Sequence, residues 1–358
     1  MDRQHRRTLT LALAAALFMV PLPAHAKVRV FIANSGDDTV SVIDDELDRE
    51  VQTIPVGNFP QGLALRNTDP LLAVSNSRGN SVTLINPVSL EKVADLITVG
   101  NFPFPLKFSA DGRLLFCGNY EDRAVSVLDL ATRTLVGQPI PIDAPPMRLA
   151  LSADGAFLYA VQYRKEGGVV VADTRTHAVI KTIPVDPFPT DLVLQPDGTR
   201  LFVGSFNGDT ITVIDLARLE VVETLDARIG DGLLIHPYKP LIYSMVTFDD
   251  EVAVFDYAQK KEVAAIAVGQ KPVYSAMRPD GKLIYVVNGS DNNVTKIDTD
   301  TNQPIARIAV GVEPTDAVAF VMPRKLPGAW VAAGAAIVVV AALAGVIGLR
   351  QRQAQTRK

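Results

Sequence analysis

"YVVNGSDNNVTKID", residues 285–298, joins two apolar segments through a loop of Gly, Ser, Asp and Asn. Nearly the same phrase occurs as "FIANSGDDTVSVID" at 31–44 and as "FVGSFNGDTITVID" at 202–215. Loops of this composition favour tight turns, and the alternating segment that follows favours a half-buried strand. The recurrence of so long a phrase indicates a repeat architecture.

The residue that ends the second strand of this phrase recurs along the whole middle of the chain. It is always Asp or Asn, and the positions are Asp44, Asn86, Asp129, Asp173, Asp215, Asp256 and Asp298. Four short strands in each unit of about 40–45 residues are typical of a propeller blade. We therefore predict an all-β, seven-bladed β-propeller of four-stranded blades over residues 27–322. The Asp or Asn should cap the next turn by accepting backbone N–H groups.

The two ends of the chain differ from its middle. Residues 1–26 have a basic start, an apolar run and small residues at the end, which predicts a secretory signal peptide. Residues 329–349 carry no charge and are long enough to cross a bilayer, which takes about 20 residues. Between them and the propeller lies a linker, 323–328. The basic tail, 350–358, favours a cytoplasmic C-terminus, although a sorting signal that is later removed is an alternative for this end.

These segments predict a single-pass protein of the inner or cytoplasmic membrane, with its propeller in the periplasm or outside the cell. The whole chain has 35 basic and 39 acidic residues; nine basic and one acidic lie in the two end segments, which leaves 26 and 38 in the propeller. The negative charge of the propeller disfavours nucleic acid as a partner. We expect a monomer. Cys117 stands where other units have Ile or Val, which predicts a buried apolar residue.

Recurring short phrases give a family resemblance. "VGNFP" at 56–60, "VGQKP" at 268–272, "VGVEP" at 310–314 and "PDG" turns resemble the YVTN family of bacterial, exported β-propeller repeats, over residues 28–321. The resemblance implies seven blades and a binding role at the cell surface or in the periplasm. It also admits an accessory role beside quinoprotein or cytochrome enzymes, or lactone hydrolysis. "PIPIDAPP" in the third unit and "DARIGDG" in the fifth depart from the pattern, so strand register is less well specified there.

Residues with catalytic chemistry are sparse. The propeller keeps two histidines, His177 and His236, in different units, so neither a histidine-rich metal site nor a Ser-His-Asp arrangement is evident. Motifs for covalent haem, dinucleotides or phosphate loops do not occur in the sequence. We expect no metal and no cofactor, and we consider an enzyme the less favoured interpretation.

The innermost strands should line a central channel. Alternation places large apolar residues between blades and the other side chains toward the axis. On this basis Arg148, Asp191, Tyr274 and Asp316 should ring the channel mouth, with Lys107 just inside. An alternative is that Arg148 and the two aspartates only pair with each other.

Phenylalanines in Gly/Pro loops should flank the same mouth. They are Phe59, Phe102, Phe104 and Phe188, and Arg164, Lys165 and Lys271 should add positive charge. Such residues can be packed lids or anchors for a partner. We predict a membrane-anchored binding or scaffold module for a protein or a small anionic ligand, with Arg148 as the charged contact. The alternative is a lactonase-like hydrolase or an accessory subunit of a quinoprotein or cytochrome system.

The ends of the propeller should close the ring together. Strands near 28–33, 40–44 and 51–56 lack an innermost partner, and the strand at 316–321 lacks a blade. Pairing them would remove two exposed sheet edges.

Overall fold

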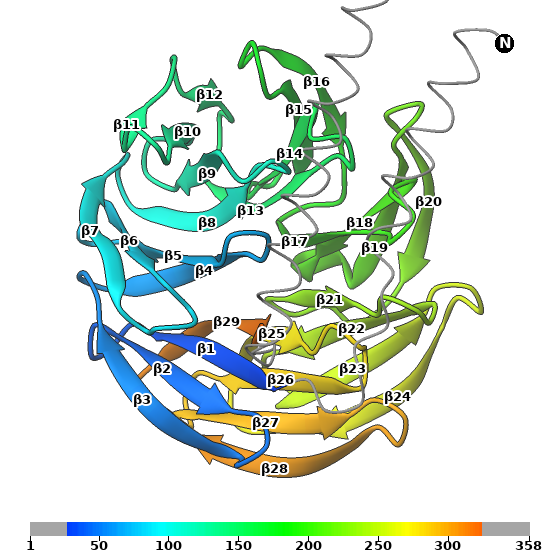
Figure 1. Ribbon diagram of the computed structural model, residues 1–358. Coiled ribbons are helices and arrows are strands. Elements are labelled where there is room, and N and C mark those ends of the chain that lie inside the picture. Colours follow the sequence, from blue (N-terminus) through cyan, green and yellow to red (C-terminus); the bar gives the residue numbers. More distant parts are fainter. Residues whose placement is uncertain (1–26, 324–358) are drawn as a thin grey trace, which may run out of the picture. The chain divides into compact units, whose positions relative to one another are not determined.

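A computed structural model describes residues 27–323. Seven antiparallel sheets stand side by side around a channel, each with its first strand innermost (Figure 1). This confirms the all-β, seven-bladed prediction. The signal peptide, the membrane-spanning segment and the tail predicted from sequence lie outside the described residues. Between residues 27 and 323, no helix has the length and apolar character needed to span a bilayer.

We number the blades from the first one that is continuous in sequence. Blade 1 holds β4 (Pro60–Arg66), β5 (Leu71–Asn76), β6 (Ser81–Ile85) and β7 (Lys92–Thr98). Blade 2 holds β8 (Pro103–Phe108), β9 (Leu114–Asn119), β10 (Ala124–Asp129), β11 (Thr134–Leu135) and β12 (Ile140–Pro141). Blade 3 holds β13 (Pro146–Leu151), β14 (Phe157–Gln162), β15 (Gly168–Asp173) and β16 (Val179–Pro184).

The later blades repeat this plan. Blade 4 holds β17 (Pro189–Leu194), β18 (Arg200–Ser205), the short 3-10 helix η2 (Phe206–Gly208), β19 (Thr210–Asp215) and β20 (Glu220–Asp226). Blade 5 holds β21 (Leu233–Ile235), β22 (Leu241–Val246), β23 (Glu251–Asp256) and β24 (Lys261–Ala267). Blade 6 holds β25 (Pro272–Met277), β26 (Leu283–Asn288), β27 (Asn293–Asp298) and β28 (Gln303–Ala309).

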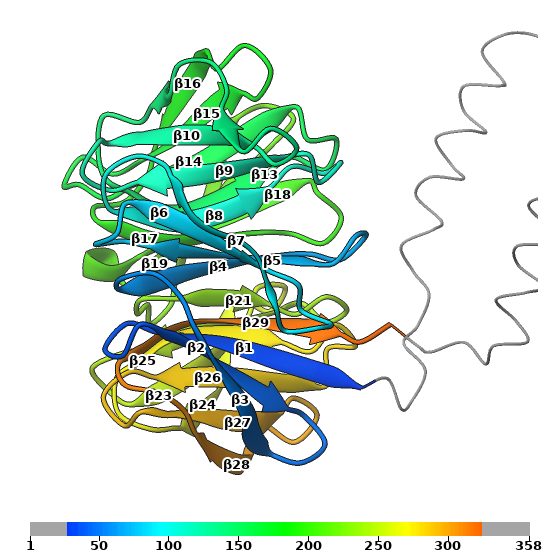
Figure 2. The same cartoon turned by 60° about the vertical axis from the view of Figure 1, so that its left-hand side comes forward.

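Blade 7 is built from both ends of the propeller. Its strand order is β29 (Pro314–Val321), β1 (Val28–Asn34), β2 (Thr39–Asp44) and β3 (Arg49–Pro55). β29 runs antiparallel to β1, with Val28 opposite Val321 and Ile32 opposite Ala317. In Figure 2 the blue and orange strands lie together, and the start of β1 and the end of β29 reach the same side. The predicted closure by mixed ends is confirmed.

The two units that depart from the repeat are also irregular in structure. The outer strand of blade 2 is broken into β11 and β12, with Gly137 between them at a φ of 66°. The inner strand of blade 5, which follows "DARIGDG", is only three residues long. Where the Val-Gly-x-x-Pro phrase is lost, a strand next to that loop is therefore shortened or broken: the outer strand before it in blade 2, and the inner strand after it in blade 5.

Apolar side chains fill the space between neighbouring blades. Cys117 of β9 is fully buried and shares a cluster with Val82 of blade 1 and Leu106 of β8, as predicted. Leu233 of β21 packs with Phe202 of the preceding blade in the same manner. The large apolar positions of the inner strands thus stabilise contacts between sheets, and their alternate neighbours are left to face the axis.

The turn after the third strand of each blade has one solution throughout. The Oδ1 of Asp298 accepts the N–H groups of Asp300 and Thr301 at 3.0 and 2.9 Å. The same pair of bonds forms at the other six positions, namely Asp44, Asn86, Asp129, Asp173, Asp215 and Asp256. The predicted capping role is confirmed. Hydrogen bonds from the turn N–H groups hold the pKa of Asp129, Asp173 and Asp298 below the ordinary value.

The seam between blades 6 and 7 carries a buried ionic cluster. Asp45 receives Arg278 Nη1 at 2.7 Å and Lys296 Nζ at 3.0 Å, and Tyr285 donates its hydroxyl to the same carboxylate. Burial, followed by the hydrogen bond to Asp45, raises the pKa of Tyr285. The seam between blades 6 and 7 is therefore joined by charges as well as by apolar contacts.

Candidate functional site

The channel has two distinct ends. Each inner strand begins after the loop that leads in from the previous blade, and it ends at the hairpin that carries, in several blades, an Asp-Gly turn. We call the first end the loop face and the second the turn face. Position along an inner strand therefore tells how far a side chain lies from either face, at about 3.3 Å per residue.

Four of the predicted residues meet in the middle of the channel. Arg148 of β13 extends across the axis, and its Nε lies 3.0 Å from Asp191 Oδ1. Its Nη1 lies 4.0 Å from Asp316 Oδ2, and its Cζ lies 4.4 Å from the centre of the Tyr274 ring. We call Arg148, Asp191, Tyr274 and Asp316 the plug. They occupy equivalent positions in blades 3, 4, 6 and 7, as the alternation of the inner strand predicts.

The two plug carboxylates also connect neighbouring blades. Asp191 accepts the N–H of Leu233, in the next blade, at 2.8 Å and that of Leu192 at 2.7 Å. Asp316 accepts the N–H of Leu63 and that of the adjacent Ala317, both at 2.9 Å. Asp191 is fully buried and Asp316 is 3% exposed. The interpretation that these groups pair with Arg148 to join blades is therefore well supported by geometry.

One guanidinium serves two carboxylates in the plug. Burial alone would lower the pKa of Arg148, but the charges of Asp191 and Asp316 raise it above the ordinary value, so the arginine stays charged. Burial raises the pKa of Asp191 and of Asp316, and Arg148 opposes that shift. Removal of one partner from a buried ion pair strongly destabilises the folded protein, because the other charge stays buried without a counter-charge.

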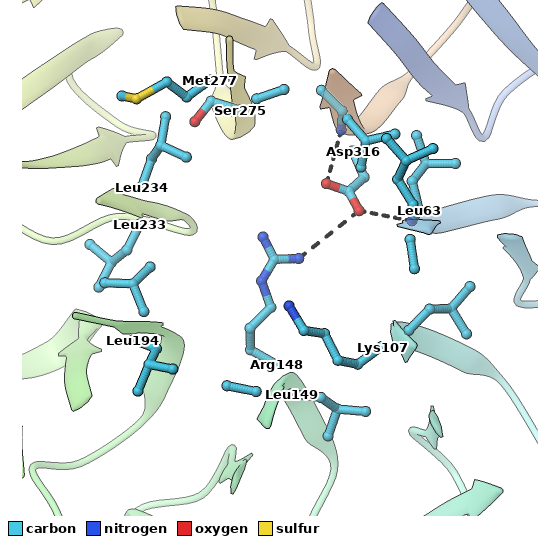
Figure 3. Close-up of a pocket in the computed structure, with 18 of the residues that line it drawn as sticks. Leu63, Lys107, Arg148, Leu149, Leu194, Leu233, Leu234, Ser275, Met277 and Asp316 are labelled. Carbon is cyan, nitrogen blue, oxygen red and sulfur yellow. Dashed lines mark hydrogen bonds and ion pairs between the residues drawn. The ribbon is translucent and has the colours of Figure 1, made fainter. Parts of the chain in front are cut away.

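A cavity of about 520 Å³ lies on the turn-face side of the plug. Lys107 of β8 and Arg148 extend into it side by side, and Asp316 lies beyond the guanidinium (Figure 3). Most of the remaining wall is apolar, including Leu194, Leu234 and Met277, which are partly exposed to the cavity. Lys107 is the one exposed residue of β8, and it opens into the channel cavity. Desolvation within the channel, and then the charge of Arg148, lower the pKa of its ammonium.

A second pocket, of about 320 Å³, lies on the loop-face side and shares no residue with the cavity. Four of the ten residues in its walls are aromatic, namely Phe102, Phe104, Tyr120 and Tyr274. The Phe104 and Tyr274 rings are 6.0 Å apart, and the Phe102 and Tyr120 rings are 5.8 Å apart. The predicted residues are thus divided, because Lys107 lies across the plug from the phenylalanine loops.

Four of the ten residues that line this loop-face pocket are polar or charged, namely Gln61, Asp231, Lys271 and Thr315. Asp231 and Lys271 lie in its wall, and Thr247 donates its hydroxyl to Asp231 Oδ2 at 3.0 Å. Burial raises the pKa of Asp231, against the opposing effects of Thr247 and Lys271. Arg164, predicted to add charge nearby, donates instead to Gln162 Oε1 and the Glu166 carbonyl at 3.0 Å each.

The predicted phenylalanines are not required by the backbone. Phe59, Phe102 and Phe188 have φ values of 58°, 52° and 52°, and the equivalent positions in blades 6 and 7 hold Lys271 and Glu313 at 56° and 51°. The turn is stabilised by its N–H: that of Phe59 donates to Asp38 Oδ1 at 2.7 Å, and that of Lys271 to Asp250 Oδ1 at 2.9 Å. The turn therefore does not require an aromatic ring at this position. A left-handed backbone costs any non-glycine residue about 1–2 kcal/mol.

These four rings differ in their surroundings. Phe104 is 8% exposed, whereas Phe59, Phe102 and Phe188 are partly exposed. Phe59 lies 6.3 Å from Phe102. Phe188 instead pairs with Tyr163 at 5.6 Å and does not line the pocket.

Sequence reasoning missed several aromatic neighbours on the loop face. Tyr120 completes the pocket, Arg78 stacks on Phe59 with 3.8 Å between its Cζ and the ring centre, and Phe206 pairs with Phe248 at 5.6 Å. Phe248 is 81% exposed. All four follow the second strand of a blade, so an alignment of those loops, and not only of the loops before inner strands, would have found them.

Within residues 27–323, no three His, Cys, Asp or Glu side chains are grouped in a manner suited to hold a metal ion. His177 and His236 lie in separate blades; His236 accepts N–H groups of its own hairpin through Nδ1.

Comparisons with known proteins identify the fold alone. The sequence matches no family model, and it matches no curated protein. Hydrazine synthase of Kuenenia stuttgartiensis is similar in structure, with a TM-score of 0.68 and 22% identity over 75% of this chain and 92% of that one. The dihydro-heme d1 dehydrogenase NirN, solved in complex with DHE, has a TM-score of 0.62 and 16% identity over 81% of this chain and 74% of that one.

Proposed function

We propose that this chain is an exported, membrane-anchored binding protein of the YVTN-repeat type, whose loop face holds a segment of a partner protein. The observation that carries the proposal is the aromatic loop-face pocket. Phe102 in its wall occupies a turn position where blades 6 and 7 have Lys271 and Glu313, so turn formation does not account for the aromatic ring.

The chemistry of the pocket favours an apolar or aromatic anchor side chain. Phe102, Phe104, Tyr120 and Tyr274 offer ring faces and edges, and their spacing leaves a hollow of about 320 Å³. Interfaces concentrate their binding energy in such central, desolvated aromatic positions. Asp231, together with the excess of acidic residues over the propeller, would favour basic residues beside the anchor.

Arg148 has no part in this proposal, although sequence analysis expected it to be the charged contact. Its guanidinium is engaged by Asp191 and covered by the Tyr274 ring, on the inner side of the pocket. The membrane location rests on sequence: residues 1–26 direct export, and residues 329–349 anchor the chain.

Site-specific photocross-linking tests both parts of the proposal. A benzophenone amino acid at Phe102, on the loop face, should yield one defined cross-linked partner in cells. The same group at Tyr238, an aromatic residue that is 67% exposed on the turn face, serves as the matched control. Protease added to spheroplasts beforehand should abolish the product, since the propeller lies outside the cytoplasm. Equal products from both positions, or protection from protease, would contradict the proposal.

A second candidate function is hydrolysis of a lactone or ester at the same pocket. Asp231 favours it, because a half-buried carboxyl with a raised pKa can act as a general acid or base. Turnover of a lactone panel that is lost in Asp231→Asn, with folding unchanged, would favour the enzyme over the binding module. An accessory role beside a redox enzyme, in line with the names of the structural neighbours, would use the loop face as proposed above.

A further inference from the structure

We propose that the turn-face cavity is a second binding site, which takes a small organic monocarboxylate with an aliphatic portion. It lies across the plug from the loop-face pocket and does not depend on the function proposed for that pocket.

The cavity contains a cation without a counter-charge. Lys107 lies on the inner strand β8, and its ammonium has no hydrogen bond or ion pair within residues 27–323. Beside it stands Arg148, whose Nε and Nη1 are directed to Asp191 and Asp316 while its Nη2 has no hydrogen bond in the same part of the chain. Desolvation first, and the charge of Arg148 second, lower the pKa of Lys107, and an anion between the two cations would offset the second effect.

The charges around the cavity select a singly charged anion. Lys107 and Arg148 supply two positive charges, and Asp316 in the wall and Asp191, which is paired with Arg148, supply two negative ones. A multiply charged anion would add repulsion from two buried carboxylates. A single carboxylate can accept hydrogen bonds from the Lys107 ammonium and from one guanidinium N–H of Arg148, with less repulsion from the two aspartates.

Apolar side chains in the wall favour an aliphatic portion in the ligand, although polar atoms make up more than half of the surface exposed in the cavity. Leu65, Leu194, Leu234, Ile235 and Met277 are each partly exposed to the cavity, so a ligand there would cover apolar surface that water now contacts. A volume of about 520 Å³ falls in the ordinary range of small-molecule pockets, about 300–1,000 Å³.

Calorimetric titration of the full chain in a non-ionic detergent, with hexanoate as the probe, tests the site. Hexanoate should bind, and Lys107→Met should weaken binding at least tenfold, because methionine keeps the length and loses the charge. Lys282→Met, at an exposed lysine of a hairpin on the same face, should bind as the wild type does. Hexanol should bind at least tenfold more weakly than hexanoate.

Other outcomes overturn the proposal. Equal affinity for hexanol would mean an apolar pocket that ignores charge, and equal affinity for inorganic phosphate would mean a site for simple anions. Failure of hexanoate to bind the wild type, or unchanged binding by Lys107→Met, would dismiss the site.

Thermal unfolding separates a ligand cation from a structural one. Without ligand, Lys107→Met should unfold at a higher temperature than the wild type, since it removes repulsion from Arg148. Hexanoate should raise the melting temperature of the wild type and leave that of the variant unchanged. A lower melting temperature for the unliganded variant would make Lys107 a counter-charge for the plug carboxylates, and the binding proposal would fail.

Discussion

The outer turns of the blades and the ring around the channel axis are made by the same repeated units, yet they differ in kind. At the turns, all seven units place Asp or Asn and form the same two hydrogen bonds. Around the axis, equivalent positions hold Gly62, Pro105, Arg148, Asp191, Gly232, Tyr274 and Asp316. The capping residue of a turn needs to accept only the backbone N–H groups of that turn, so the same residue type serves in every unit.

The ring positions meet one another, and each therefore depends on what the others contribute. A Cβ on Gly62 would lie 1.9 Å from the Phe104 carbonyl oxygen, so β8 itself excludes a side chain there. Arg148 extends across the axis because Asp191 and Asp316, from other blades, form ion pairs with its guanidinium. In a repeat protein, the residues that differ between units are consequently the ones that create a unique centre.

The largest effect expected at the ring comes from removal of β29. Ending the chain at Glu313 deletes Asp316 and leaves β1 with an unpaired edge, so the loss should exceed the whole stability of a typical domain, about 5–15 kcal/mol. A chain ended at Pro323 is the matched control, since it lacks the same C-terminal segment and keeps the strand. We expect a cooperative thermal transition by circular dichroism only for the control; identical melting curves would show that the ring does not need its closing strand.

Arg148→Met should have the next largest effect, because it leaves two buried carboxylates without their cation. Breaking a buried pair in this way costs about 3–5 kcal/mol. Arg164→Met, which removes a loop-face cation bonded only within its own loop, should cost far less and is the control. Denaturant unfolding at pH 7 measures both.

The stability lost in Arg148→Met should depend on pH. Asp191 and Asp316 already have raised pKa values, and without Arg148 only hydrogen bonds from backbone N–H groups oppose that shift. A raised folded-state pKa means that stability is present at low pH and lost as pH rises through it. The deficit should therefore shrink between pH 7 and about pH 5. A deficit that stays constant over this window would mean that the carboxylates found other partners.

The smallest effect should follow loss of one turn cap. Asp298→Ala removes an acceptor from the N–H groups of Asp300 and Thr301, which can turn to water, so we expect about 0.5–1.5 kcal/mol. Because the pKa of Asp298 is lowered, this contribution is present above about pH 4 and lost as pH falls further. Wild type and variant should thus converge in acid; a cost as large as that of Arg148→Met would erase the distinction between turn and ring.

Sequence alone was sufficient where the determinants are local or strictly alternating. Asp298 caps its turn through residues two and three positions away, and the parity of regular inner strands placed Arg148, Asp191 and Asp316 together. Parity says which way a side chain points, but not how side chains from other blades divide the channel. The separation of Lys107 from the phenylalanine loops was therefore not foreseen.

The aromatic residues of the loop face differ in how far the sequence could predict them. Tyr120 lies beside Phe102 of its own blade, so an alignment of the loops after the second strands would place it. Phe248 pairs with Phe206 of the preceding blade, and no period within its own unit encodes that contact. The broken outer strand of blade 2 was anticipated only as a weak register, since "PIPIDAPP" signals the loss of a pattern and not what replaces it.

The pairing of β29 with β1 determines how the propeller would bear mechanical load. Val28 and Val321 lie opposite each other, so force that pulled Lys27 away from Pro323 would peel the two strands apart one residue pair after another. Tension between a partner held on the loop face and an attachment point at Pro323 would instead run along the length of β29. Its bonds to β1 stand across that direction and would share the load, so the strand would resist by shear.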